Sequence, residues 1–257
     1  MPDLSLTVIG SGTLVPDTTR SCSANLIVYQ NERILVDMGF GTLASLTRLH
    51  INPLTISTLY ITHFHPDHVA DLIPLIFTRI HAGAPVNQPL KIVGPFGIEA
   101  FLIKSAAAYG DWLITAVKET TRIVEIGSGH HPISDGFCEA FPMKHAPESL
   151  GYRFQFGEYF IAMTGDTGYC ENAIDVCKNA DIAIVECGAL EDGGNHLSPA
   201  EVARIAIKAQ PRQLLINHCY PKVVASNPVR LITDKYTGQV EHAYDGLVLN
   251  LEANQDD

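Results

Sequence analysis

Basic residues are scarce in this sequence. Its 257 residues include 17 lysines and arginines against 28 aspartates and glutamates, which gives a formal net charge of −11. No local cluster of lysine and arginine offsets this balance. We therefore expect no long-range attraction for a polyanion and no extended nucleic acid partner.

Long apolar runs and a leader-like start are also missing. Charged, proline or glycine residues interrupt each apolar run before it reaches the length that spans a bilayer. The chain starts Met-Pro-Asp, without the positive region and long apolar stretch of a secretory signal. These absences predict a cytoplasmic protein with no membrane segment.

None of the six cysteines forms a Cys-x-x-Cys pair. They are Cys22, Cys138, Cys170, Cys177, Cys187 and Cys219. Their scatter through apolar segments fits buried free thiols better than a disulfide framework. Cys219 follows His218 directly, and we interpret it as a small core residue, with a metal-ligand role as the alternative.

The composition that is present suits a compact core. Hydrophobic residues make up 46% of the chain and charged residues 18%. No low-complexity linker or abrupt charge shift divides the sequence, so we expect residues 1–257 to form a single domain.

Apolar patterning and turn residues predict an α/β protein. Strands are expected at 4–10, 25–30, 33–37, 56–61, 90–93, 122–126, 137–143, 152–156, 159–163, 181–185, 214–216 and 247–251. Helices are expected at 43–49, 67–80, 98–109, 173–178, 198–209 and 228–235. Two hairpins are expected to turn at Asn31-Glu32 and at Gly157-Glu158. Both halves alternate in this way, which favours a four-layer αβ/βα sandwich, with two sheets face to face and helices outside.

Four potential metal ligands stand within six residues in His63-Phe64-His65-Pro66-Asp67-His68. Packing does not easily explain four such residues in one turn after a buried strand. Imidazole nitrogen and carboxylate oxygen are the ligands that zinc takes in hydrolytic sites. In an extended turn His63 and His65 point the same way, whereas Asp67 and His68 turn aside as a helix begins.

Three later residues also stand directly after predicted strands. They are His145, Asp166 and His218. Each is weak evidence alone, but loops at strand ends commonly carry functional residues, and the set is typical of ligands gathered from separate loops.

This pattern resembles the metallo-β-lactamase superfamily over nearly the whole chain. The resemblance implies two divalent ions that share a carboxylate and a bridging water or hydroxide. Its ligands would be His63, His65 and His145 for one ion, Asp67, His68 and His218 for the other, and Asp166 for both. We expect zinc, with manganese or iron as alternatives.

Further segments resemble the ribonuclease Z-like branch. They are Gly10-Ser11-Gly12-Thr13 with Pro16, residues 36–42 (Val-Asp-Met-Gly-Phe-Gly-Thr), Gly94-Pro95 with Gly97-Ile98, Lys144-His145 leading to Gly151-Tyr152, and His196-Leu197-Ser198. Two features depart from that branch: its long arm for transfer RNA is replaced by a short hairpin, and Val185-Glu186-Cys187-Gly188 lacks the histidine of the corresponding segment.

The resemblance and these departures favour a hydrolase of a small phosphodiester. Asp67 would orient the nucleophile, His196 would donate to the phosphoryl oxygen or leaving group, and Glu186 would orient His196. A helix cap or loop hydrogen bond is the alternative role for His196. Alternative functions are hydrolysis of a lactone, thioester or sulfate ester on the same centre, or a metal-stabilised binding protein without turnover.

The remaining histidines lack such a context. They are His50, His81, His130, His131 and His242. We interpret them as structural or surface residues, with His130-His131 in a solvated loop, and Trp112 as a hydrophobic anchor. A homodimer is expected from the family resemblance alone.

Overall fold

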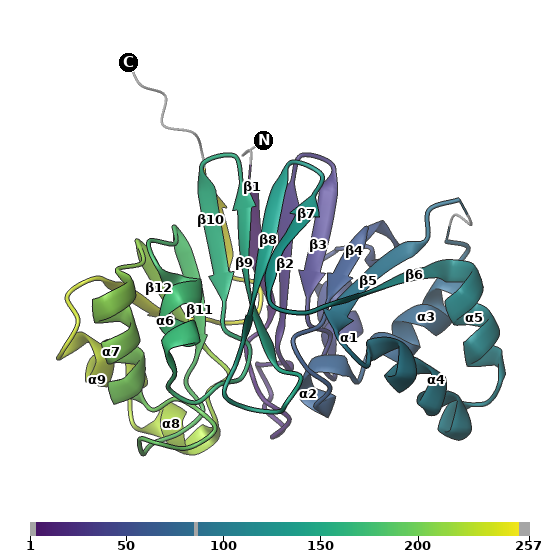
Figure 1. Cartoon of the computed structure of the whole chain (residues 1–257). Helices are drawn as coiled ribbons and strands as arrows, with labels where there is room; N and C mark the ends of the chain where they lie inside the picture. The colour runs from purple at the N-terminus through teal and green to yellow at the C-terminus, as the bar shows by residue number, and fades with distance from the viewer. Residues whose placement is uncertain (1–3, 85–86, 252–257) are drawn as a thin grey trace. The chain divides into compact units, whose positions relative to one another are not determined.

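The computed structural model describes residues 4–84 and 87–251 (Figure 1). The Met-Pro-Asp start lies outside these residues. The chain divides into two compact units. Unit 1 comprises Met1–Gly10, Thr18–Glu125 and Tyr244–Asp257, and unit 2 comprises Ser11–Asp17 and Ile126–Ala243.

Unit 1 is built on a mixed sheet, seven-stranded over the described residues, in the order β14-β1-β2-β3-β4-β5-β6. The strands are β1 (Leu4–Gly10), β2 (Ala24–Tyr29), β3 (Glu32–Val36), β4 (Thr58–Tyr60), β5 (Leu90–Pro95), β6 (Thr121–Ile126) and β14 (Val248–Leu251). β14, β1, β2 and β3 are antiparallel neighbours, and β3, β4 and β5 are parallel. Parallel strands bring their carboxyl ends to one edge, which is where the candidate site of this unit begins.

The helices of unit 1 pack their apolar faces on this sheet. They are α1 (Thr42–Arg48), α2 (Pro66–Val69), α3 (Leu72–His81), α4 (Ile98–Tyr109) and α5 (Trp112–Thr120), with a 3-10 turn, η1 (Pro53–Thr55). Leu72, Ile73 and Ile76 of α3 join Leu35 and Leu59 of the strands in one buried cluster. This spacing along α3 is the helical periodicity of an amphipathic element.

Unit 2 repeats the scheme with a mixed sheet, again seven-stranded within the described part, ordered β13-β12-β11-β10-β9-β8-β7. Its strands are β7 (Gly129–Ile133), β8 (Gly136–Pro142), β9 (Leu150–Phe156), β10 (Tyr159–Met163), β11 (Ile182–Glu186), β12 (Gln213–Asn217) and β13 (Gln239–His242). β10 to β13 run parallel, and β7 to β10 are antiparallel. The predicted turn at Gly157-Glu158 is confirmed between β9 and β10, which form a short hairpin.

Helices α6 (Glu171–Cys177), α7 (Pro199–Ala209), α8 (Pro221–Ala225) and α9 (Pro228–Thr233) belong to unit 2. The expected start of α7 is confirmed as a capping box. The Ser198 side chain accepts from the Glu201 backbone N–H, and the Glu201 side chain accepts from the Ser198 backbone N–H. Val202, Ile205 and Ala206 of α7 then pack into the buried core of this unit.

One expected helix was wrong: residues 67–80 form two helices, α2 and α3, with a break at Ala70-Asp71. The segment after β3 forms hydrogen bonds with the backbone groups at this break. The Asp71 N–H donates to the Met38 carbonyl at 3.0 Å, and the Met38 N–H donates to the His68 carbonyl at 2.7 Å. The Asp71 N–H and the His68 carbonyl are thus bonded to the segment after β3 and not within a helix, so one continuous helix cannot form here.

Other differences lie in polar or short elements. His130 and His131 form part of strand β7 and not a loop, although the strand remains partly exposed. The first hairpin turns at Gln30-Asn31, one residue earlier than expected, with Gln30 at φ 51°. The pattern also missed α5, α8 and β13. Across the described residues, no helix combines the length and apolar character needed to cross a bilayer.

Candidate metal-binding clusters

The four residues of the His63–His68 motif lie together in unit 1. We call His63, His65, Asp67 and His68 the histidine cluster. β4 ends at Tyr60, a short loop with bends at Thr62 and His65 follows, and Pro66 opens α2 with His65 as its N-cap. The His63 ring centroid lies 4.6 Å from that of His65 and 4.2 Å from that of His68. His63, Asp67 and His68 are buried, whereas His65 is exposed, so the cluster has a buried base and an open side.

Asp37 fixes the histidine cluster, and the sequence pattern gave it no role. Nδ1 of His68 lies 2.7 Å from Asp37 Oδ2. Thr62 donates its backbone N–H to Asp37 Oδ1 at 2.8 Å, and its hydroxyl bonds both Asp37 oxygens and His63 Nδ1. A carboxylate that binds Nδ1 of a histidine orients the ring and directs Nε2 toward a metal. The signals in the sequence were its position at the end of the strand expected at 33–37 and its place in the 36–42 segment that resembles the ribonuclease Z-like branch.

The backbone at Asp37 and Gly39 permits this contact. Asp37 has φ 62°, in the left-handed region that aspartate and asparagine tolerate better than most residues. A Cβ added at Gly39 would lie 1.9 Å from the backbone oxygen of Asp67. Because glycine has no Cβ, the backbone at position 39, just after β3, can pack directly against the backbone of α2. This contact supports the histidine cluster.

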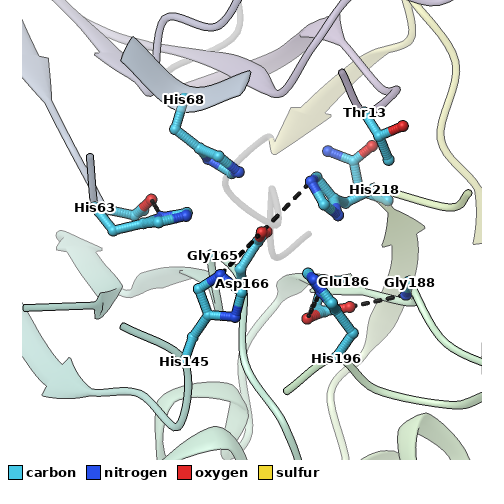
Figure 2. A network of polar contacts seen from close by, with 12 residues as sticks. Thr13, His63, His68, His145, Gly165, Asp166, Glu186, Gly188, His196 and His218 are labelled. Carbon is cyan, nitrogen blue, oxygen red and sulfur yellow. Dashed lines mark hydrogen bonds and ion pairs between the residues drawn. The ribbon is translucent and has the colours of Figure 1, made fainter. Parts of the chain in front are cut away.

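His145, Asp166 and His218, which we call the Asp166 cluster, lie together in unit 2 (Figure 2). His145 follows β8, Asp166 follows β10, and His218 follows β12. The His145 loop is tied to the Asp166 loop by an isolated bridge between Lys144 and Gly168. His218 has φ 53°, a conformation uncommon for histidine and frequent at functional sites.

In the Asp166 cluster, each histidine nitrogen lies at about the distance from Asp166 that separates two ligands of the same ion. His145 Nε2 lies 3.7 Å and His218 Nε2 lies 3.5 Å from the same oxygen, Asp166 Oδ2. Both distances are longer than a good N–H···O hydrogen bond. Zinc–ligand bonds of about 2.0–2.2 Å in a tetrahedral site put ligand atoms roughly 3.3–3.6 Å apart. His145 Nδ1 is held by the Asn195 carbonyl at 3.0 Å, which directs Nε2 toward Asp166.

Glu186 and His196 form a second polar pair in unit 2. His196 Nδ1 lies 2.9 Å from Glu186 Oε1. Backbone N–H groups of Thr167, Gly188 and Leu197 donate to the same carboxylate at 2.8, 2.8 and 3.3 Å. The His196 ring stacks on that of His218, with centroids 5.6 Å apart and planes at 17°. Ligand-type atoms of Glu186, His196 and His218 lie within 4.8 Å of one another, but the donors around Glu186 fit an orienting role better than a ligand role.

Two cysteines lie near these clusters, Cys22 beside Asp67 and Cys219 directly after His218. Burial raises the pKa of the Cys22 thiol to about 11, and nearby Asp67 adds to this rise, so the thiol stays neutral. Cys219 is buried and lies against the Asn217 carbonyl, which suits a core residue. Within the described part of the chain, the candidate metal groups include neither cysteine nor any of the histidines interpreted as structural.

Comparison of the sequence with known proteins shows the family to which this chain belongs. The chain belongs to the family described as beta-lactamase superfamily domain, whose model matches residues 32–219. Ribonuclease BN from Escherichia coli O17:K52:H18 is 27% identical to it, over 84% of this chain and 88% of that protein. The residues matched by the family model include both clusters.

Solved structures agree on the fold. The metallo-β-lactamase fold protein YhfI from Bacillus subtilis aligns with a TM-score of 0.85 at 23% identity, over 98% of this chain and all of that one. The short form of human tRNase Z aligns with a TM-score of 0.74 at 22% identity, over 96% and 98% of the two chains. The expected metallo-β-lactamase fold class is confirmed, and the chain carries His and Asp groups that could hold a metal ion.

Proposed function

We propose that this protein is a dinuclear metal-dependent hydrolase of small phosphodiesters. The observation that carries the proposal is the Asp166 cluster, in which two histidine nitrogens lie at ligand–ligand distance from one carboxylate oxygen. That arrangement suits a carboxylate shared by two ions. The histidine cluster, held by Asp37 through His68, supplies the remaining donors.

The assignment uses seven side chains. The ligands are His63, His65 and His145 for one ion, Asp67, His68 and His218 for the other, and Asp166 for both. Five imidazoles and two carboxylates form a donor set that zinc favours, and manganese or iron also accept it. When bound, two such ions lower the pKa of a coordinated water and offset negative charge on a phosphoryl oxygen.

The protein's own groups position and move protons around that centre. Glu186 accepts a hydrogen bond from His196 Nδ1 and so fixes the orientation of the ring and of its Nε2 atom. His196 Nε2 then donates a proton to the phosphoryl or leaving-group oxygen. Asp67, at the start of α2, orients the attacking nucleophile from the other cluster.

A small phosphodiester fits this protein better than transfer RNA. Ribonuclease BN and tRNase Z, as their names say, act on RNA, and RNA cleavage is phosphodiester chemistry. Here the net charge is −11, and β9 and β10 are joined by a two-residue turn. Neither feature favours binding to an extended polyanion.

The direct test is metal analysis of the purified protein together with turnover of bis-p-nitrophenyl phosphate. We expect two divalent ions per chain and measurable release of p-nitrophenol. Fewer than one ion per chain after reconstitution would sink the ligand assignment. Turnover of carboxylic, thio- or sulfate esters without phosphodiester turnover would replace the proposed substrate class.

The role of His196 is tested separately. We expect His196→Ala to lower kcat on the diester by about 100-fold or more and to retain both ions. His130→Ala is the matched control, because His130 lies on β7 with its side chain 61% exposed. Normal turnover by His196→Ala would remove this residue from the mechanism.

A further inference from the structure

A cavity of about 630 Å³ opens in unit 2 beside the Glu186–His196 pair. Three segments line it: the loop before β2, the loop after β11 and the start of α8. Its apolar wall consists of Val15, Ala189, Leu190, Tyr220, Pro221 and Val223. The volume falls in the range of roughly 300–1,000 Å³ that holds small ligands.

The mouth of this cavity exposes large apolar side chains to water. Val15 is 43% exposed and Leu190 is 48% exposed, and both line the same hollow. Scattered exposed apolar residues need no explanation, but apolar residues gathered around one concavity indicate an apolar ligand group. The occupant therefore has a substantial apolar part.

Tyr220 and Gly188, which line the cavity, also lie against residues of the proposed reaction site. The Tyr220 ring centroid lies 5.8 Å from that of His196 and 5.7 Å from that of His218, both edge-on. The Gly188 N–H donates to Glu186 Oε2, and a Cβ at Gly188 would lie 3.1 Å from the His196 ring. A group attached to a phosphate near His196 thus reaches the cavity directly.

The polar residues of the lining favour an aromatic group over an alkyl chain. Tyr220 provides an aromatic wall, and rings attract one another beyond simple area burial. Lys222 and Glu191 add a cation and a carboxylate to otherwise apolar walls. An alkyl chain makes no ring contact with Tyr220, whereas a planar aromatic group does, and a nucleobase would in addition offer polar edges to Lys222 and Glu191.

We propose that this cavity binds the planar aromatic group of the phosphate ester, either a simple aryl ring or a nucleobase. This inference rests on the proposed function for the position of the phosphate. It makes Val15, Leu190 and Tyr220 specificity-determining residues of the site.

The test measures binding of three phosphate monoesters to the metal-loaded protein by calorimetry. Methyl phosphate lacks a ring, phenyl phosphate carries an aryl ring, and thymidine 5′-monophosphate carries a nucleobase. We expect at least one aromatic ester to bind about tenfold more tightly than methyl phosphate. The ester with the larger preference identifies the ring type.

Val15→Trp fills the cavity mouth and should reduce that preference to about twofold or less. Val224→Trp is the matched control: Val224 is also a valine, is 40% exposed and lies on α8 outside the lining. It should keep the wild-type preference. Equal binding of all three esters by the wild type, or an unchanged preference in Val15→Trp, would overturn the inference.

The same samples separate this inference from the proposed function. If the wild type prefers an aromatic monoester but does not turn over bis-p-nitrophenyl phosphate, the cavity assignment stands and the phosphodiesterase proposal fails. If it turns over the diester but binds the three monoesters alike, the reverse holds.

Discussion

Nδ1 of His68 lies 2.7 Å from Oδ2 of Asp37, with the two side chains 1% and 3% exposed. A carboxylate only accepts, so the imidazole donates its Nδ1–H and keeps Nε2 for coordination. Glu186 stands in the same relation to His196 at 2.9 Å. In each unit a buried acid at the end of a strand therefore fixes a histidine.

The first prediction concerns Asp37→Asn, which keeps the side-chain shape and tolerates the left-handed backbone at this position. We expect metal affinity to fall by about 10- to 100-fold, because the neutral amide orients His68 less firmly and lowers its basicity. Competition with a chromophoric chelator measures the dissociation constants. Asp111→Asn, at the exposed N-cap of α5, is the control. Equal affinities in both variants would mean that Asp37 serves packing alone.

The importance of Asp37 shows what the sequence can and cannot predict. The His-x-His-x-Asp-His spacing, and His145, Asp166 and His218 after strands, are visible because each residue type stands out locally. Asp37 is functional only because β3 and β4 are parallel neighbours, with Val36 paired to Tyr60. A pairing between strands separated by a helix leaves no local periodicity in the sequence.

The same reasoning explains the agreement and the errors in the fold. β1, β10 and α4 have the predicted bounds, since apolar alternation, helical spacing and flanking turn residues all agree there. The break between α2 and α3 depends on bonds to the distant Met38. Strand β7 is polar and partly exposed, so pairing with β8, and not burial, makes it a strand.

The second prediction concerns Gly39→Ala. The added Cβ would lie 1.9 Å from a backbone oxygen of α2, which cannot move as a side chain can. We expect a loss of unfolding free energy of about 4 kcal/mol or more, or failure to fold. Urea denaturation measures it. Gly194→Ala is the control, because the atoms nearest to its Cβ lie 3.9 Å away. A stable Gly39→Ala protein would contradict the close approach of β3's exit to α2.

The third prediction concerns Glu186→Gln. We expect kcat on a diester to fall by about 100-fold through loss of His196 orientation, with KM and bound metal little changed. The amide also disturbs the backbone donors around position 186, so unfolding free energy should drop by about 1–3 kcal/mol. Glu158→Gln, in the exposed turn between β9 and β10, should match the wild type. A fall in metal content equal to the fall in kcat would instead make Glu186 a ligand.

The fourth prediction concerns the pH dependence of stability at Asp192. The Ser198 hydroxyl, and after it Arg204, lower the pKa of this carboxyl in the folded protein. A lowered folded pKa contributes stability above the unfolded value of about 4 and loses it as pH falls through the folded pKa. Because the side chain is 45% exposed, Asp192→Asn should cost only about 0.5 kcal/mol at neutral pH. Unfolding free energies of variant and wild type should converge in acid. A gap that is independent of pH would assign the effect to packing.

The last prediction concerns removal of metal. A ligand at about 1,000 times its dissociation constant stabilises the folded state by about 4 kcal/mol, which for a chain of this size raises Tm by roughly 8–16 °C. A chelator should therefore lower Tm by that amount, and zinc should restore it. Asp166→Ala removes the carboxylate that both ions share, so its Tm should respond little to chelator or zinc. Cys219→Ala should keep the full response, since a small core thiol beside His218 is not a ligand. A lost response in Cys219→Ala with a retained one in Asp166→Ala would move the metal site away from the Asp166 cluster.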